Sequence, residues 1–199
     1  MIFGLKKLKR EMRMKQIGKI IIFVVLISGL LTIDVSAKVL VSAGNAFKLL
    51  VPEATETKIE TKVLTEEQKK LIEATADVKF NSELDKEFVF YIGKNNGEIV
   101  GFAAEDRVKG KWGVIHYMIV FNTNGSIRDL VVLEYSEKRG RPVAKERFRK
   151  QFRGMTINDR IRLKKDIRGV SGASISSTGM TNGVRKMTHV FHELYIKNN

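Results

Sequence analysis

The strongest pattern in the sequence is a pair of apolar stretches, each broken by an Asn-Gly dipeptide. The sequence EFVFYIGKNNGEIVGFAA places Asn96 and Gly97 between two apolar runs, and KWGVIHYMIVFNTNGSIRDLVVLEY repeats the arrangement around Asn124 and Gly125. Asn-Gly readily adopts the positive φ angles of tight hairpin turns. Each stretch is therefore predicted to be a β-hairpin, and the pair predicts a mainly antiparallel sheet.

The strand expected over Trp112–Phe121 is apolar at both of its alternating sets of positions. Successive side chains on a strand point to opposite faces. We therefore expect other elements to cover this strand on both sides, and we expect Trp112 to lie in the core.

Helices are predicted before and after the hairpins. Thr65 and Gln68 have the spacing of a capping box and predict a helix after residue 64. The remaining expectations are a short juxtamembrane helix within Lys38–Val51, a polar connector over Glu53–Val63, a helix from Pro142 through Phe152, and a final helix over about Ser177–Ile196. The predicted fold class is α+β, a mainly antiparallel sheet flanked by helices.

The N-terminus has the pattern of a membrane-targeting segment. Residues 1–19 hold seven basic residues and one acidic residue, and the fourteen uncharged residues Ile20–Ile33 follow them. Val35 and Ala37 fit a signal-peptidase site, so cleavage after Ala37 and an uncleaved anchor are both open, and we favour the anchor. The expected organisation is 1–37 as anchor or signal peptide, 38–64 as juxtamembrane helix and connector, and 65–199 as an extracytoplasmic domain.

The net charge of +14 is consistent with nucleic-acid binding, but export across a membrane argues against that partner. Thirteen cations and three acids fall within Lys138–Arg168. This stretch is interpreted as a solvated face, or as a surface for anionic lipid, an acidic partner protein or a phosphate. The chain has no cysteine, which excludes disulfides, thiolate metal ligands and a thiol nucleophile.

The stretch GVSGASISS, Gly169–Ser177, gathers glycine, alanine and serine just ahead of the final helix. Small residues let backbone amides approach an anion, and a helix N-terminus favours negative charge. The alternative is a serine-rich loop that only caps the helix. Composition alone favours the capping loop, and no lysine-bearing phosphate loop is present.

The order of these residues resembles the covalent-flavin motif [ST]-G-A-T-x-[ST] of the FMN-binding domain family. Ser171, Gly172 and Ala173 match the motif, and Ser174 stands at the position of the acceptor threonine. The resemblance implies FMN joined through its phosphate to the Ser174 hydroxyl by a flavin transferase. It also implies a membrane redox partner or a quinone-linked electron donor.

The resemblance covers about Phe88–Lys186 and includes two departures. Glu137-Lys-Arg-Gly140 replaces the family's E-T-P-G turn, and Arg168 stands where an aspartate is usual. The resemblance implies cofactor contacts through the motif and its surroundings, at Ser174, Ser171, Gly172, Ala173, Ser176, Ser177, Trp112 and Glu137. Tyr135 is a further aromatic residue for covering the flavin ring, although a core role is favoured for it.

The sequence therefore favours an extracytoplasmic flavoprotein that relays electrons. The alternative is a binding or sensor module of the same fold without covalent flavin. His189 and His192 lie three residues apart, which is a weak metal signal, and His116 is predicted to be a hydrogen-bonded core residue. No metal site is predicted.

Overall fold

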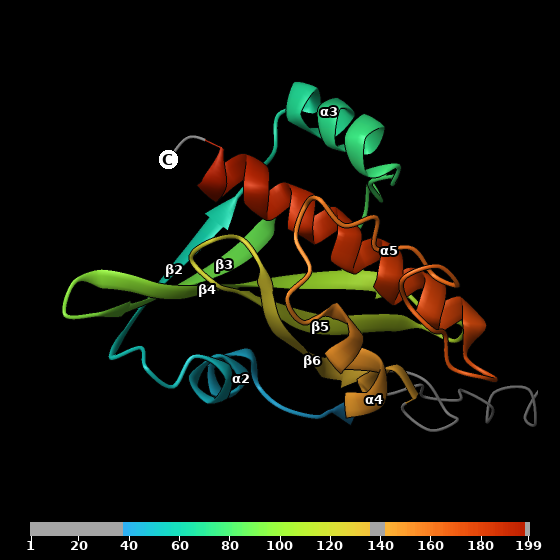
Figure 1. Cartoon of the computed structure of the whole chain (residues 1–199), viewed down its shortest axis with the longest axis horizontal. Helices are drawn as coiled ribbons and strands as arrows, with labels where there is room; N and C mark the ends of the chain where they lie inside the picture. Colours follow the sequence, from blue (N-terminus) through green and yellow to red (C-terminus); the bar gives the residue numbers. More distant parts are fainter. Residues whose placement is uncertain (1–37, 136–141, 198–199) are drawn as a thin grey trace, which may run out of the picture. The chain divides into compact units, whose positions relative to one another are not determined.

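The computed structural model describes residues 38–135 and 142–197, which are built around one antiparallel sheet (Figure 1). Its six strands are β1 (Lys38–Val39), β2 (Glu56–Lys62), β3 (Phe88–Asn95), β4 (Glu98–Lys109), β5 (Val114–Phe121) and β6 (Ile127–Tyr135). Their order across the sheet is β1-β6-β5-β4-β3-β2, and all neighbours are antiparallel. The predicted α+β class is confirmed.

Helices cover both faces of this sheet. They are α2 (Ala43–Leu50), α3 (Glu66–Ala76), α4 (Glu146–Arg149) and α5 (Ser174–Phe191), with 3-10 turns η1 (Pro142–Ala144) and η2 (Lys150–Phe152) and the π-helical turn η3 (His192–Ile196). In Figure 1, α3 and α5 lie on one side of the sheet and α2 lies on the other.

Strand β5 is covered on both faces, as predicted. Tyr117 and Ile119 belong to the larger core beneath α5, whereas Met118 and Val120 belong to a smaller core beneath α2. All four side chains are fully buried. The double apolar pattern therefore reflects two cores that share one central strand.

The predicted turns and cap are also present. Asn96 and Gly97 join β3 to β4 with φ angles of 51° and 84°, the positive values of a tight hairpin turn. Gly125 has φ 85° in the turn between β5 and β6. At the start of α3, Thr65 Oγ1 accepts from Gln68 N at 3.2 Å, and Gln68 Oε1 accepts from Thr65 N at 3.0 Å.

Two glycines let α5 press closely onto β4. A Cβ at Gly179 would lie 2.5 Å from the carbonyl oxygen of Lys109, and a Cβ at Gly183 would lie 2.5 Å from Val108 Cγ1. Such distances are too short for a side chain. The backbone of α5 therefore contacts β4 directly along this line.

Several boundary predictions were wrong for identifiable reasons. Residues 53–63 contain strand β2, an edge strand whose alternating charged residues conceal its pairing with β3. The helix expected over Lys38–Val51 is limited to α2, after the two-residue strand β1. The helix expected from Pro142 is broken into η1, α4 and η2, and α5 begins at Ser174 rather than at Ser177.

The N-terminal segment 1–37 lies outside the described residues. Among residues 38–135 and 142–197, no helix is long and apolar enough to cross a membrane. The predicted anchor, its cleavage site and the domain boundary at residue 37 thus stay predictions from the sequence.

Candidate functional site

The turn that precedes α5 presents small residues at the protein surface. Gly172 has φ 76°, and no atom lies within 4 Å of the place where its Cβ would be. This left-handed conformation favours glycine and reverses the chain between Ser171 and Ala173. Ser171 and Ser174 are both exposed, and Ser174 is the first residue of the helix.

The N-terminus of α5 carries backbone donors without a side-chain cap. The first helical hydrogen bond runs from Ser177 N to the carbonyl oxygen of Ala173, at 2.9 Å. The amides of Ser174 and Ile175 precede that bond, and the N-cap residue Ala173 supplies no capping hydrogen bond. The positive end of the dipole of this 18-residue helix therefore lies beside the Ser174 hydroxyl.

The two later serines of the stretch lie in a different environment. Ser176 and Ser177 are both fully buried. Ser177 Oγ accepts a hydrogen bond from Val170 N at 3.1 Å, and the same oxygen lies 3.8 Å from the place where a Cβ on Gly169 would be. The structure thus gives Ser177 the role of holding the preceding loop against the helix, which the sequence did not predict.

Gln151 fixes the other end of that loop. Its Oε1 accepts from Arg168 N at 2.8 Å, and its Nε2 donates to Arg168 O at 3.2 Å. The same Nε2 lies 3.2 Å from the carbonyl oxygen of Phe148. This glutamine therefore fastens the chain ahead of the motif to α4 and η2, a function that nothing in its sequence context indicated.

A cavity of about 770 Å³ opens between α4, η2 and this loop. This volume falls within the roughly 300–1,000 Å³ that is typical of small-molecule sites. Its lining combines the buried ring of Phe148 with four exposed cations and the first serine of the motif: Pro142, Lys145, Arg147, Phe148, Lys150, Gln151, Arg168, Gly169, Val170 and Ser171.

Of the two aromatic residues predicted as cover for the flavin ring, Trp112 is exposed and Tyr135 is buried. Trp112 lies in the loop after β4 and is 57% exposed, so the expectation that it belongs to the strand and the core was wrong. Its loop follows Lys109, which contacts α5 at Gly179, five residues or roughly 7.5 Å along the helix from Ser174. Tyr135 is buried in the core, and Glu137 lies outside the described residues.

A second cavity, of about 600 Å³, lies between α3, the end of β4 and α5. In its wall the buried Lys186 Nζ contacts Asp85 Oδ1 and lies 2.9 Å from Asp106 Oδ1, while the Tyr117 hydroxyl donates to Asp106 at 2.7 Å. Burial raises the pKa of Asp106. Burial alone lowers the pKa of Lys186, but its two carboxylate partners raise it overall. Nothing in the sequence pattern indicated this cluster.

The histidines take part in local contacts. His116 Nε2 lies 2.6 Å from Glu105 Oε2, which confirms that it is hydrogen bonded. His189 Nδ1 lies 3.4 Å from Thr75 Oγ1, and burial lowers the pKa of His189. Within the part of the chain that the structure describes, no group of three or more His, Asp or Glu side chains is placed to hold a metal ion.

Comparison with known proteins shows a family that part of this chain resembles. Residues 110–189 match the family described as the FMN-binding domain. Over 114 residues the chain is 25% identical to a subunit of the Na(+)-translocating ferredoxin:NAD(+) oxidoreductase complex of Acetobacterium woodii. That match covers 52% of this chain and 55% of the relative, so the chain spans about half the length of the curated relative.

The fold has a counterpart among solved structures. The crystal structure of Shewanella oneidensis NqrC superimposes with a TM-score of 0.50, covering 78% of this chain and 89% of that chain. The sequence identity is 14%, so the likeness shows a shared fold. The family match, from residue 110 to residue 189, runs from the loop that carries Trp112 into α5 and includes Ser174.

Proposed function

We propose that the chain is a flavoprotein electron carrier with FMN bound covalently to Ser174, because residues 110–189 match the FMN-binding domain family. The observation that carries the proposal is the position of this serine. Its hydroxyl is exposed at the uncapped N-terminus of α5, where backbone amides and the helix dipole favour a phosphate.

The motif and its surroundings supply an acceptor hydroxyl, backbone amide donors and a cation for a phosphoester at Ser174. Ser174 Oγ would hold the FMN phosphate as a phosphoester. Forming that bond would break the pyrophosphate bond of a flavin dinucleotide donor, and the serine proton would leave with the nucleoside monophosphate. The amides of Ser174 and Ile175 would bind the phosphate oxygens, and Arg168, on the wall of the adjoining cavity, would offset their negative charge. A serine hydroxyl and a phosphate do not condense unaided in water, so a flavin transferase is the expected partner for maturation.

The neighbouring space fits the rest of the cofactor. The cavity beside Ser171 has the volume of a small-molecule site, and Phe148 gives it an apolar wall. The exposed indole of Trp112 lies in the loop after β4, with Lys111 Nζ 5.0 Å from its ring centroid, and is a further candidate for contact with the flavin ring. When bound, FMN supplies the one- and two-electron chemistry, and the protein supplies position and electrostatic environment.

The location and the partners are part of the same proposal. The Acetobacterium woodii relative is one component of an oxidoreductase complex, and the basic, apolar N-terminus of this chain is typical of an anchor. We therefore place the domain on the extracytoplasmic side of a membrane, passing electrons to or from a membrane redox partner or a quinone-linked donor.

The test is co-expression with a flavin transferase, followed by denaturing electrophoresis and detection of flavin fluorescence in the gel. Ser174→Ala is expected to abolish the fluorescent band, and Ser174→Thr is expected to keep it. Thr178→Ala is the matched control, because this exposed hydroxyl lies one helical turn later on α5. An unchanged band in Ser174→Ala would exclude this serine. No band in any variant, from cells that flavinylate a known acceptor, would instead favour the binding-module alternative.

A further inference from the structure

Three cations project from the short segment that forms one wall of the proposed flavin cavity. Lys145, Arg147 and Lys150 are all exposed, and none of them forms an ion pair within residues 38–135 and 142–197. Arg149 and Arg153, in contrast, are paired with carboxylates of Asp129 and Glu146. The three unpaired cations therefore form a local excess of positive charge, which we name the α4 basic face.

This face is held rigidly against the sheet. Phe148 and Phe152 are buried in the larger core, with their rings 5.5 Å apart. The Arg149 guanidinium donates to the carbonyl oxygen of Ala144 at 2.9 Å and to that of Leu130 on β6. The backbone beneath the α4 basic face is thus fixed, so its cations are presented together without ordering a loop.

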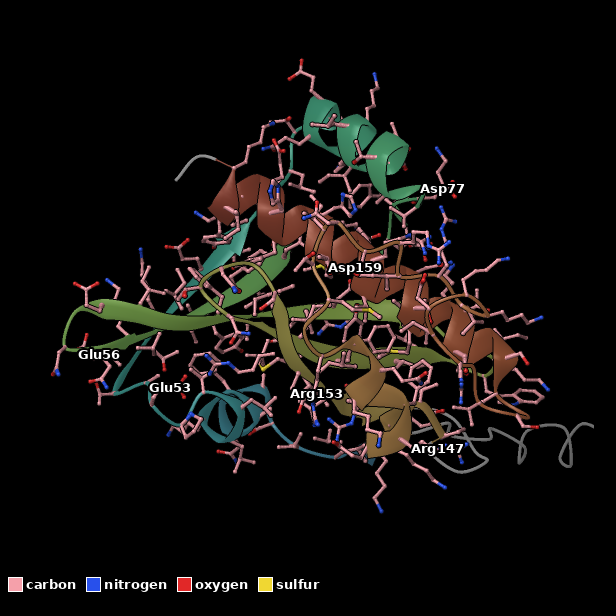
Figure 2. All side chains as sticks on the ribbon, in the orientation of Figure 1. Glu53, Glu56, Asp77, Arg147, Arg153 and Asp159 are labelled. Atoms are coloured by element: carbon pink, nitrogen blue, oxygen red, sulfur yellow. The ribbon has the colours of Figure 1, made fainter. Side chains whose placement is uncertain are left out.

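The α4 basic face lies at the sheet edge where the described chain begins. Lys38 pairs with Tyr135 and Val39 pairs with Glu134, which places β1 beside the end of β6. Helix α4 also contacts β6. Figure 1 shows α4 beside β6, and Figure 2 labels Arg147 there. The residue that follows the predicted anchor and the basic face therefore share one edge.

We propose that the α4 basic face, together with Lys38, docks onto the anionic phospholipid headgroups of the membrane that holds the N-terminal segment. This inference rests on the anchor in the proposed function. Headgroup phosphates match the unpaired cations, and attachment through residue 37 keeps a bilayer at high local concentration next to this edge.

Docking in this orientation would turn the proposed flavin cavity toward the membrane surface. The cavity wall includes all three cations of the α4 basic face as well as Arg168 and Ser171. A bilayer against that wall therefore puts the cofactor next to the membrane surface. Electron exchange is then expected with a membrane-embedded or membrane-bound partner rather than with a carrier diffusing in bulk solvent.

The size of the effect follows from the electrostatics of anionic membranes. Each cation near such a surface favours binding by about fivefold, so three of them favour the docked form by roughly 100-fold. Because the contact is electrostatic, high salt is expected to remove it by screening.

The experiment uses the full flavin-loaded chain in nanodiscs of phosphatidylcholine, or of an equal mixture of phosphatidylcholine and phosphatidylglycerol. Hydrogen exchange is measured for residues 145–152 and 168–171. We expect exchange there to be slower in the mixed lipid, and the difference to vanish in high salt and in Lys145→Gln/Arg147→Gln/Lys150→Gln. The matched control Lys70→Gln/Lys86→Gln/Lys109→Gln removes the same charge from exposed positions on other segments and should behave like the wild type.

Two kinds of result would overturn the inference and can be told apart. Equal exchange in the two lipids, or equal slowing in the wild type and in the basic-face variant, contradicts docking while leaving the anchor and the flavin in place. A chain that does not enter nanodiscs contradicts the anchor and docking together. Flavin attachment is measured separately, from the mass of the peptide that contains Ser174. A missing flavin is therefore distinguished from a failure of docking.

Discussion

At the scale of single residues, the serines of one short stretch have opposite environments. Ser174 is exposed at the start of α5, whereas Ser177 is fully buried and accepts from Val170 N. They lie within and directly after the flavin motif. The sequence predicted Ser174 as the acceptor and Ser177 as a cofactor contact, but it gave no sign that Ser177 is buried. In the structure, one hydroxyl is available for chemistry and the other supports the loop that presents it.

This difference in burial predicts that substitutions at Ser174 and Ser177 change the free energy of unfolding by different amounts. Ser177→Ala leaves the Val170 amide without its acceptor and is expected to lower the free energy of unfolding by about 1–3 kcal/mol. Ser174→Ala is expected to change the free energy of unfolding by less than about 0.5 kcal/mol, as is usual for exposed positions. Urea unfolding of the flavin-free proteins measures both values. Similar losses in the two variants would contradict the assignment.

A second residue-scale prediction concerns acid stability. Hydrogen bonds from Lys58 and then Lys62 lower the pKa of Glu60 from 4.5 to about 2, and the Tyr195 hydroxyl also donates to it at 3.2 Å. A carboxyl whose pKa is depressed by folding stabilises the native state above its unfolded pKa. That contribution is lost as the pH falls from about 4.5 to about 2.

Glu60→Gln is therefore expected to flatten the dependence of unfolding free energy on pH in this window. Glu98→Gln is the control, because Glu98 is also a strand glutamate but lies on β4, outside this cluster. Thermal unfolding followed by circular dichroism at several acid pH values gives the slope. Parallel slopes for the wild type and Glu60→Gln would show that the Glu60 cluster does not stabilise the fold.

At the scale of elements, the closest backbone approach at any glycine in the described part of the chain is the one between α5 and β4. Gly179→Ala would place a methyl group 2.5 Å from the Lys109 carbonyl oxygen, and backbone cannot yield as a flexible side chain can. We expect a loss of about 1–3 kcal/mol in unfolding free energy. Gly44→Ala is the control, since nothing lies within 4 Å of that Cβ and alanine favours a helix by about 0.5–1 kcal/mol. Chemical denaturation compares the two, and a neutral Gly179→Ala would contradict the close contact.

The elements also show what a sequence can predict. The hairpin at Asn96-Gly97 and the cap at Thr65 were predicted correctly because their causes are local: a positive φ angle and two short hydrogen bonds. Strand β2 was missed because its sequence ETKIETK is polar, and its pairing partner β3 lies about thirty residues away. Trp112 was misplaced because apolar alternation continues past the true start of β5 into the loop.

The site was predictable only in part for the same reason. The motif located Ser174 by its order of residues. Gln151, which fastens Arg168 from 17 residues away, carries no local signal. The cluster of Lys186, Asp85 and Asp106 likewise forms only when three distant segments meet. Contacts of this kind depend on the tertiary fold and are invisible to periodicity or spacing.

At the scale of the whole molecule, the sheet separates the proposed flavin site from the smaller core. Phe47 of α2 is buried and stacks on Tyr91, with ring centroids 5.5 Å apart, on the face opposite to α5. Phe47→Ala is expected to lower the free energy of unfolding by about 3–5 kcal/mol. Because Ser174 belongs to the other face, the folded fraction should still accept flavin. Loss of attachment at a temperature where the variant is folded would contradict this separation.

Covalent flavin at Ser174 can be read directly from the mass of the protein purified from its native host, with peptide mapping across residues 169–185. We expect an added mass equal to FMN less one water, on the peptide that contains Ser174, and its absence in Ser174→Ala. An unmodified peptide, from cells shown to attach flavin to another protein, would contradict covalent attachment at Ser174.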